Sequence, residues 1–289
     1  MTVKMAIPNK GRLNVRAVEL VSKAGIGLGD SLERKLSVRV PDLDLEIFFV
    51  RAQDIPTFIA SGAVDFGLTG QDLVAEAGYR LEKLLDLNFG QCRLAIAGPE
   101  YSPIVKNGVY PAGVRVATSY PRLTRRYFEE QGVAAEIVPV QGAAEIMPHL
   151  GVSDLISDLV ATGDTLRMNR LQEIDTVMAS EASVFASAAA LADSVKQTAI
   201  TEVVESIRAV MAAENRRYLM ADVPKAELPE VEKILPGIGG PTVLEIAGHP
   251  DVVAVQAVIP TKDTYRVVNA LKKIGGRGIL TVAFDRLVE

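Results

Sequence analysis

The feature that most constrains the fold of this chain is an alternation of short apolar runs with helix-periodic segments over roughly its first 185 residues. Strands that alternate with helices in this way are typical of α/β folds. Six apolar runs are predicted to be strands, at residues 45–50, 64–69, 93–98, 114–119, 135–140 and 154–160.

Helical periodicity marks three further segments. A second helix should begin after Asp54, the expected N-cap, with Pro56 in its first turn. A long amphipathic helix is predicted over 195–213. The first helix presents one apolar face, made of Leu13, Ala17, Leu20, Val21 and Ala24.

The remainder of the chain has a different order, with single helices between paired strands. Two of these strands are joined by a turn that contains glycine and proline, residues 248–251. The order βαββαβ predicts a ferredoxin-like domain. Its elements are strand 216–223, helix 225–235, strands 241–247 and 252–259, helix 261–275 and strand 278–287.

Composition excludes several classes of protein. The chain has 289 residues, which suggests two or three domains, and its net charge of −5 argues against non-specific nucleic-acid binding. Cys92 is the only cysteine, so the chain can form neither an internal disulfide nor a cysteine-based zinc site. We find no apolar run of the ~18 residues that a membrane span needs, and no signal-peptide pattern. We therefore expect a cytoplasmic enzyme or binding protein without nucleic-acid or membrane partners.

The stretch ISDLVATGDTL, residues 156–166, ends a predicted strand in a turn of small polar residues before a helix. Gly163 and its small neighbours would let an anion approach the backbone N–H groups, and a helix start adds roughly half a positive charge. The pattern suggests a phosphate-binding turn, with Asp158 placed to accept hydrogen bonds from sugar hydroxyls. A plain strand-to-helix turn with a threonine cap explains these eleven residues equally well. No Gly-Lys-Ser/Thr follows, so the turn is not a Walker loop.

The longer stretch 145–166 resembles the signature of the ATP phosphoribosyltransferase family. Two further segments agree. Residues 6–13 are similar to the family's N-terminal motif, with Asn9 extra or replaced, and 50–74 is similar to a stretch that carries Arg, Gly-x-x-Asp-x-Gly and Thr-Gly-x-Asp. The nine fixed positions of the signature are filled by Glu145, Gly151, Ser153, Ile156, Asp158, Thr162, Gly163, Thr165 and Leu166.

The resemblance covers nearly the whole chain and implies a two-lobed, periplasmic-binding-protein-like catalytic core of α/β class. It places 1–92 with 178–205 in one lobe and 93–177 in the other, with substrates in the cleft. The chain continues for ~75 residues beyond the short-form members, which implies the long form with a C-terminal regulatory domain at 212–289.

The reaction that the resemblance implies joins N1 of the ATP adenine to C1 of phosphoribosyl pyrophosphate and expels pyrophosphate. Such a reaction needs positioning and electrostatic stabilisation more than a covalent nucleophile. The residues fit this demand, because neither His149 nor His249 lies in a nucleophile–base pattern. Cys92 is expected to be a small buried hydrophobic residue.

The resemblance also implies roles for the signature residues. Asp158 and Glu145 would accept hydrogen bonds from ribose hydroxyls, and either could contact Mg²⁺. The ion itself should bind mainly to the pyrophosphate oxygens. The 5′-phosphate would be held by the backbone N–H groups of Ala161, Thr162, Gly163, Asp164 and Thr165, and the two threonine hydroxyls would assist.

Three basic residues are suited to bind the phosphates of ATP or the pyrophosphate: Lys10, Arg12 and Arg51. Lys10 is also a candidate catalytic residue. Arg16 lies one turn into a helix, and a surface role and a ligand contact are both open for it. Asp72 is interpreted either as an N-cap or as a substrate contact, and the two are not exclusive.

The resemblance further implies that histidine binds the C-terminal domain and inhibits by favouring a hexamer over a dimer. Asp222 would pair with the ligand's amino or imidazole group and Thr242 would hold its carboxylate. As alternatives, Asp222 simply ends a strand and residues 239–242 form only a turn.

Two other functions remain possible from the sequence. One is a non-catalytic binding protein, which the missing export signal and the complete signature disfavour. The other is a nucleobase-salvage phosphoribosyltransferase. That class carries two adjacent acidic residues before the loop, whereas this chain has Ser157 and Asp158.

Overall fold

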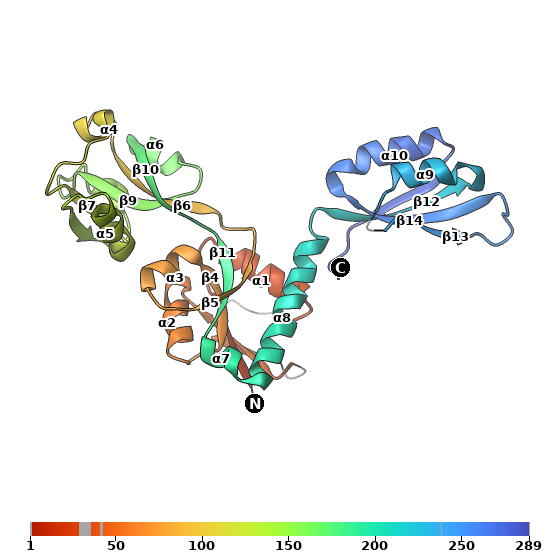
Figure 1. Ribbon diagram of the computed structural model, residues 1–289, viewed down its shortest axis with the longest axis horizontal. Coiled ribbons are helices and arrows are strands. Elements are labelled where there is room, and N and C mark those ends of the chain that lie inside the picture. The colour runs from red at the N-terminus through yellow and green to blue at the C-terminus, as the bar shows by residue number, and fades with distance from the viewer. Residues whose placement is uncertain (1, 29–35, 41–42, 238, 289) are drawn as a thin grey trace. The chain divides into compact units, whose positions relative to one another are not determined.

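The computed structural model describes residues 2–28, 36–40, 43–237 and 239–288 (Figure 1). Its contacts divide the chain into two compact units, Met1–Glu19 with Gly27–Val204, and Leu20–Ile26 with Glu205–Glu289. Three sheets organise these units: two lie in the first and one in the second.

The first lobe is built on a six-stranded sheet in the order β2-β3-β1-β4-β11-β5. Its central strands are parallel, whereas β2, β5 and β11 pair antiparallel with their neighbours. The strands are β1 (Val3–Pro8), β2 (Ser37–Val40), β3 (Leu45–Val50), β4 (Phe66–Gly70), β5 (Glu82–Asp86) and β11 (Ala182–Ala186). The helical segments are α1 (Asn14–Lys23), η2 (Ala52–Asp54), α2 (Ile55–Ala60) and α3 (Gln71–Ala77).

The second lobe is built on a five-stranded sheet in the order β10-β6-β9-β7-β8. β7, β8 and β9 are parallel, and β6 is antiparallel to both β9 and β10. The strands are β6 (Cys92–Pro99), β7 (Arg115–Thr118), β8 (Glu136–Pro139), β9 (Leu155–Val160) and β10 (Leu171–Ser180). The helical segments are α4 (Pro103–Asn107), α5 (Pro121–Glu130), η3 (Ala144–Ile146) and α6 (Asp164–Met168).

The chain passes between the two lobes twice, from β5 to β6 and from β10 to β11 (Figure 1). Ser180 pairs with Cys92, so the two crossing segments lie side by side. The lobes also meet through their helices, because the Glu76 carboxylate of α3 accepts hydrogen bonds from the N–H groups of Arg122 and Leu123 at the start of α5. Helices α7 (Ala188–Ala192) and α8 (Ser194–Ala213) follow β11.

The C-terminal sheet has four antiparallel strands in the order β13-β14-β12-β15, and α9 and α10 cover one of its faces (Figure 1). Leu219, Val223, Val231, Val255 and Leu271 form its core. The elements are β12 (Arg216–Pro224), η4 (Lys225–Glu227), α9 (Leu228–Ile234), β13 (Thr242–Glu245), β14 (Val252–Pro260), η5 (Thr261–Asp263), α10 (Thr264–Lys273) and β15 (Arg277–Val282).

The predicted fold class is confirmed: a two-lobed α/β core precedes a βαββαβ domain. The six strands predicted in the core lie within two residues of those observed. The limits drawn from the sequence for the lobes and the regulatory domain, 1–92 with 178–205, 93–177 and 212–289, stay predictions.

One detail of the prediction was confirmed only in part, and another was wrong. Asp54 occupies the N-cap position of α2, but its side chain caps nothing, because its backbone is already helical (φ −89°, ψ −18°) at the end of η2. The last strand ends at Val282 instead of residue 287. The Leu287 N–H instead donates to the carbonyl of Ala209 in α8.

Five strands had no counterpart in the prediction: β1, β2, β5, β10 and β11. The longest of them, β10, lies at the edge of its sheet, and most of its residues are only partly buried. An edge strand of this kind has no continuous apolar run for a sequence pattern to detect.

Candidate active site

The turn between β9 and α6 has the geometry of an anion-binding loop. Gly163 adopts a left-handed conformation (φ 82°), which glycine tolerates without steric cost. In the part of the chain that the structure describes, the N–H groups of Thr162, Gly163 and Thr165 donate to no protein acceptor. Leu166 is buried and anchors the turn, whereas its polar residues face outward. The turn therefore presents three free main-chain donors at one place.

Asp164 is engaged within the turn itself. Its carboxylate accepts a hydrogen bond from the Thr162 hydroxyl at 2.5 Å and pairs with Arg167. The hydrogen bond from Thr162 and the charge of Arg167 hold the pKa of Asp164 below its usual range. The Asp164 N–H donates to the Thr162 hydroxyl at 3.4 Å and the carboxylate is paired with Arg167, so both polar groups of Asp164 already have partners within the turn.

The two carboxylates predicted to bind the sugar lie near one another. Asp158 is on β9 and accepts a hydrogen bond from the N–H of Leu159 at 2.7 Å, and Glu145 is in η3. Burial raises the pKa of Asp158, and the nearby charge of Glu145 raises it further. Two carboxylates so placed can receive hydroxyl groups or a cation.

The described residues contain no cluster of three or more histidine, cysteine or acidic side chains that could hold a metal ion. Mg²⁺ usually binds through one or two carboxylates, several waters and substrate phosphates. The Asp158–Glu145 pair fits a cation of that kind when it arrives with a phosphorylated substrate.

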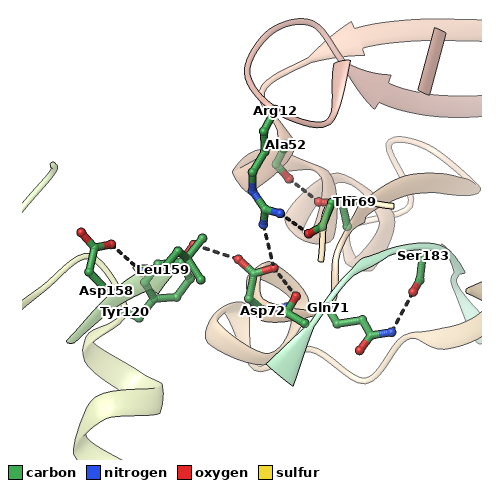
Figure 2. Close-up of polar contacts among 11 residues, drawn as sticks. Arg12, Ala52, Thr69, Gln71, Asp72, Tyr120, Asp158, Leu159 and Ser183 are labelled. Atoms are coloured by element: carbon green, nitrogen blue, oxygen red, sulfur yellow. Dashed lines mark hydrogen bonds and ion pairs between the residues drawn. The ribbon is translucent and has the colours of Figure 1, made fainter. Parts of the chain in front are cut away.

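A second cluster surrounds Asp72, whose side chain is 1% exposed (Figure 2). Its Oδ2 accepts a hydrogen bond from the Tyr120 hydroxyl at 2.8 Å, and its Oδ1 accepts one from the Ser180 hydroxyl at 2.6 Å. The guanidinium of Arg12 lies 3.6 Å from the same Oδ1 and also donates to the carbonyl of Gly90. Residues from three separate regions of the chain thus meet at one buried carboxylate.

The N-cap interpretation of Asp72 was wrong. The N-cap of α3 is Gly70, and Asp72 lies in the first turn, where its carboxylate bonds Tyr120 and Ser180 instead of the helix backbone. A side chain at position 70 would collide with Asp72 Oδ1. Glycine at that position therefore leaves the space that the carboxylate occupies.

The two clusters are linked through Tyr120. Burial raises the pKa of Tyr120, the charge of Asp72 raises it further, and Asp158 adds a smaller effect of the same sign. The charge of Asp158 thus acts on the same Tyr120 hydroxyl that donates to Asp72.

The remaining basic candidates differ in their surroundings. The side chains of Lys10 and Arg51 are exposed and form no hydrogen bond or ion pair with any residue that the structure describes. Arg16 pairs with Glu19 one turn along α1, at 2.7 Å, and is partly exposed. This contact is compatible with both interpretations of Arg16. Lys10 and Arg51 are available for an anionic ligand.

The expectation for Cys92 needs correction. It is partly exposed and is paired across the strands with Ser180, whose hydroxyl bonds Asp72. Burial raises the pKa of Cys92 nevertheless. The residue lies at the edge of the Asp72 cluster and not in a purely apolar core.

Several residues of the 50–74 motif stabilise the structure of the first lobe. Asp65 accepts hydrogen bonds from the N–H of Lys4 and from Lys196 Nζ, and the Thr69 hydroxyl donates to the carbonyl of Ala52 at 2.8 Å. A Cβ at Gly67 would lie 2.8 Å from the carbonyl oxygen of Ala6. Within this motif Asp72 alone is brought to Arg12, and Arg51 lies at the end of β3.

Sequence reasoning missed Tyr120 and Ser180. Tyr120 lies two residues after the end of β7, at the carboxyl end of a parallel strand, where ligand-binding residues of α/β folds gather. That placement could have identified it. Ser180 had no such signal, because its strand was not predicted.

In the C-terminal domain, Asp222 and Thr242 lie on strands either side of β14. Asp222 is opposite Ala254 and Thr242 is opposite Gln256, so both side chains lie on the same face of the sheet. Both are exposed. Asp222 does not end its strand, since β12 continues to Pro224.

The fold defines a two-lobed α/β protein joined to a small ferredoxin-like domain. The family model of ATP phosphoribosyltransferase matches residues 51–209, and the model of that family's C-terminal domain matches 213–286. The chain belongs to the ATP phosphoribosyltransferase family and is an enzyme of the phosphoribosyltransferase class.

Similar proteins agree with this assignment. The ATP phosphoribosyltransferase of Gemmatimonas aurantiaca is 43% identical over 99% of both chains, and that of Methanothermobacter thermautotrophicus is 41% identical over 100% of both. Among solved structures, the ATP phosphoribosyl transferase (HisG:HisZ) complex from Thermotoga maritima matches with a TM-score of 0.63 and 28% identity, covering 72% of this chain and 96% of that one. Within the described residues, no helix is both long and apolar enough to span a membrane.

Proposed function

We propose that this chain transfers the phosphoribosyl group of phosphoribosyl pyrophosphate to N1 of ATP and releases pyrophosphate, the first step of histidine biosynthesis, in the cytoplasm. The observation that carries the proposal is the turn 161–165, where three free N–H groups lie beside the neighbouring carboxylates Asp158 and Glu145. That combination matches the two ends of a ribose 5-phosphate.

Breaking the bond between C1 and the leaving oxygen builds positive charge on the ribose and negative charge on pyrophosphate. Asp158 and Glu145 accept hydrogen bonds from the ribose hydroxyls, and their negative charge stabilises the positive charge that develops on the ribose. Arg12, Lys10 and Arg51 bind the phosphate oxygens of pyrophosphate or ATP, with Arg16 as a further candidate and Asp72 beneath Arg12. A Mg²⁺ ion held by Asp158 or Glu145 would neutralise charge on the pyrophosphate.

The activity can be tested by incubating the protein with phosphoribosyl pyrophosphate and Mg²⁺, together with either ATP or free nucleobases. We expect ultraviolet absorbance to grow only with ATP. Turnover only with a free base would assign the chain to nucleobase salvage. A complex with phosphoribosyl pyrophosphate should show the 5′-phosphate on the N–H groups of the turn, and a phosphate bound elsewhere contradicts the site.

We also propose that histidine inhibits by binding the open face of the C-terminal sheet between Asp222 and Thr242, and that the chain forms dimers and, with histidine, hexamers. The support is the shared face of these two residues and the free exposure of both. Asp222→Ala and Thr242→Ala should each weaken inhibition, whereas Glu245→Ala, an exposed change on the same strand as Thr242, should not. Light scattering with and without histidine tests the change of assembly, and unaltered inhibition in both variants would reject the site.

A further inference from the structure

A single buried hydroxyl holds both the backbone and the side chain of Asp72. Ser180 Oγ donates to Asp72 Oδ1 at 2.6 Å and accepts from the Asp72 N–H at 3.0 Å. Both Ser180 and Asp72 are buried. Because the hydroxyl is donor and acceptor at once, it fixes the carboxylate relative to the start of α3.

Ser180 is also the last residue of β10, where the chain returns from the second lobe to the first. It is paired with Cys92 on the other crossing segment. The neighbouring residue Glu181 is tied to the same helix, because its carbonyl accepts a hydrogen bond from the N–H of Gln71. The start of α3 is therefore anchored to the crossing between the lobes.

Arg12, not Asp72, is the member of this cluster that faces outward. The Arg12 side chain is 38% exposed, whereas that of Asp72 is 1% exposed. Asp72 Oδ1 and the carbonyl of Gly90 hold the guanidinium from one side, as Figure 2 shows for the contact with Asp72. The remaining N–H groups of Arg12 can bind an anion. A carboxylate in the position of Asp72 orients the ligand-binding side chain without contacting the ligand itself.

We propose that Ser180 is a positioning residue that acts through Asp72 on Arg12 and thereby sets the affinity of the enzyme for a phosphate chain, either that of ATP or the pyrophosphate group of the second substrate. The proposal rests on the proposed function, in which Arg12 binds these oxygens. In Ser180→Ala the oxygen Oδ1 that faces Arg12 loses its hydroxyl donor and its link to the backbone, so Arg12 loses its fixed direction.

The experiment compares four variants by steady-state kinetics with each substrate varied in turn: Ser180→Ala, Arg12→Ala, the double variant, and Ser183→Ala as a control. Ser183 is also a buried serine at the crossing, but its hydroxyl bonds Asp86 and Gln71 and not Asp72. Ser180→Ala should raise the KM of the substrate whose KM Arg12→Ala raises, by about 5- to 10-fold, as expected for the loss of one hydrogen bond, with a smaller effect on kcat. Ser183→Ala should leave that KM unchanged.

In the Arg12→Ala background, Ser180→Ala should change the KM no further, because both act through one guanidinium. Ser180→Thr, which keeps a donor and an acceptor, should recover part of the affinity and replaces Ser180→Ala if that variant does not fold. An equal effect of Ser180→Ala with and without Arg12, or the same effect in Ser183→Ala, overturns the proposal. Absence of turnover in the unaltered enzyme instead rejects the proposed function itself.

Discussion

Lys196 Nζ lies 2.7 Å from Asp65 Oδ1, so that helix α8 is joined by an ion pair to the residue just before β4. The side chains are 20% and 8% exposed, respectively. Asp65 also accepts a hydrogen bond from the N–H of Lys4 on β1 at 2.8 Å. The pair therefore ties α8 to the central strands of the first lobe.

Lys196→Met should destabilise the protein by about 3 kcal/mol, because it leaves the buried Asp65 carboxylate without its cation. Lys233→Met is the matched control: its partner Glu230 lies on the same exposed helix surface, and the loss should stay below about 0.5 kcal/mol. Urea unfolding of both variants measures the difference. Equal losses would show that the Asp65 pair has no special structural role.

Asp158→Asn should remove activity and raise stability together. If Asp158 faces the ribose as proposed, loss of its charge should lower kcat/KM by about 10²- to 10³-fold. Because burial raises the pKa of Asp158, its charged form is disfavoured in the folded state at neutral pH, and an uncharged isostere removes that cost.

The pH dependence of that stability gain follows from the sign of the shift. The folded protein holds the Asp158 proton more tightly than the unfolded chain does, so the cost of the charge is fully present above the folded pKa and disappears as pH falls through it. Thermal unfolding of Asp158→Asn at pH 7 and near pH 4 should therefore show a gain that shrinks in acid. A gain that grows in acid contradicts the buried-charge explanation.

Gly67→Ala should cost about 1–3 kcal/mol by forcing β4 away from β1. The new Cβ would lie 2.8 Å from the Ala6 carbonyl oxygen and 2.9 Å from Ile55 Cγ2. Gly27→Ala, where no atom lies within 4 Å of the added carbon, should be close to neutral. Chemical denaturation of both variants checks the prediction, and comparable losses at the two positions would rule out steric overlap as the cause.

Tyr120→Phe should destabilise the protein by about 1–3 kcal/mol, because Asp72 Oδ2 loses its hydrogen bond in a buried place. Tyr110→Phe is a suitable comparison. It removes a hydrogen bond to the neutral Tyr127 hydroxyl, at 3.2 Å, and leaves no carboxylate without a hydrogen-bond donor. Calorimetry should show the smaller loss in Tyr110→Phe. The reverse order would mean that Asp72 does not depend on Tyr120.

The amino-acid sequence by itself determined the fold class and the strand–turn–helix geometry of residues 156–166. A strand that ends at Val160, a left-handed Gly163 and the start of α6 are all set by neighbouring residues, so the local pattern carries their geometry. The C-terminal domain was predictable for the same reason, since its strands and helices show clear periods of two and 3.6 residues.

Only the tertiary structure decided the cluster around Asp72. Tyr120 and Ser180 lie 48 and 108 residues further along the chain, and neither belongs to a repeating pattern that includes Asp72. The hydrogen bonds exist because two crossing segments and two helices bury one carboxylate together, and a burial shared between distant segments leaves no periodic trace in any one of them.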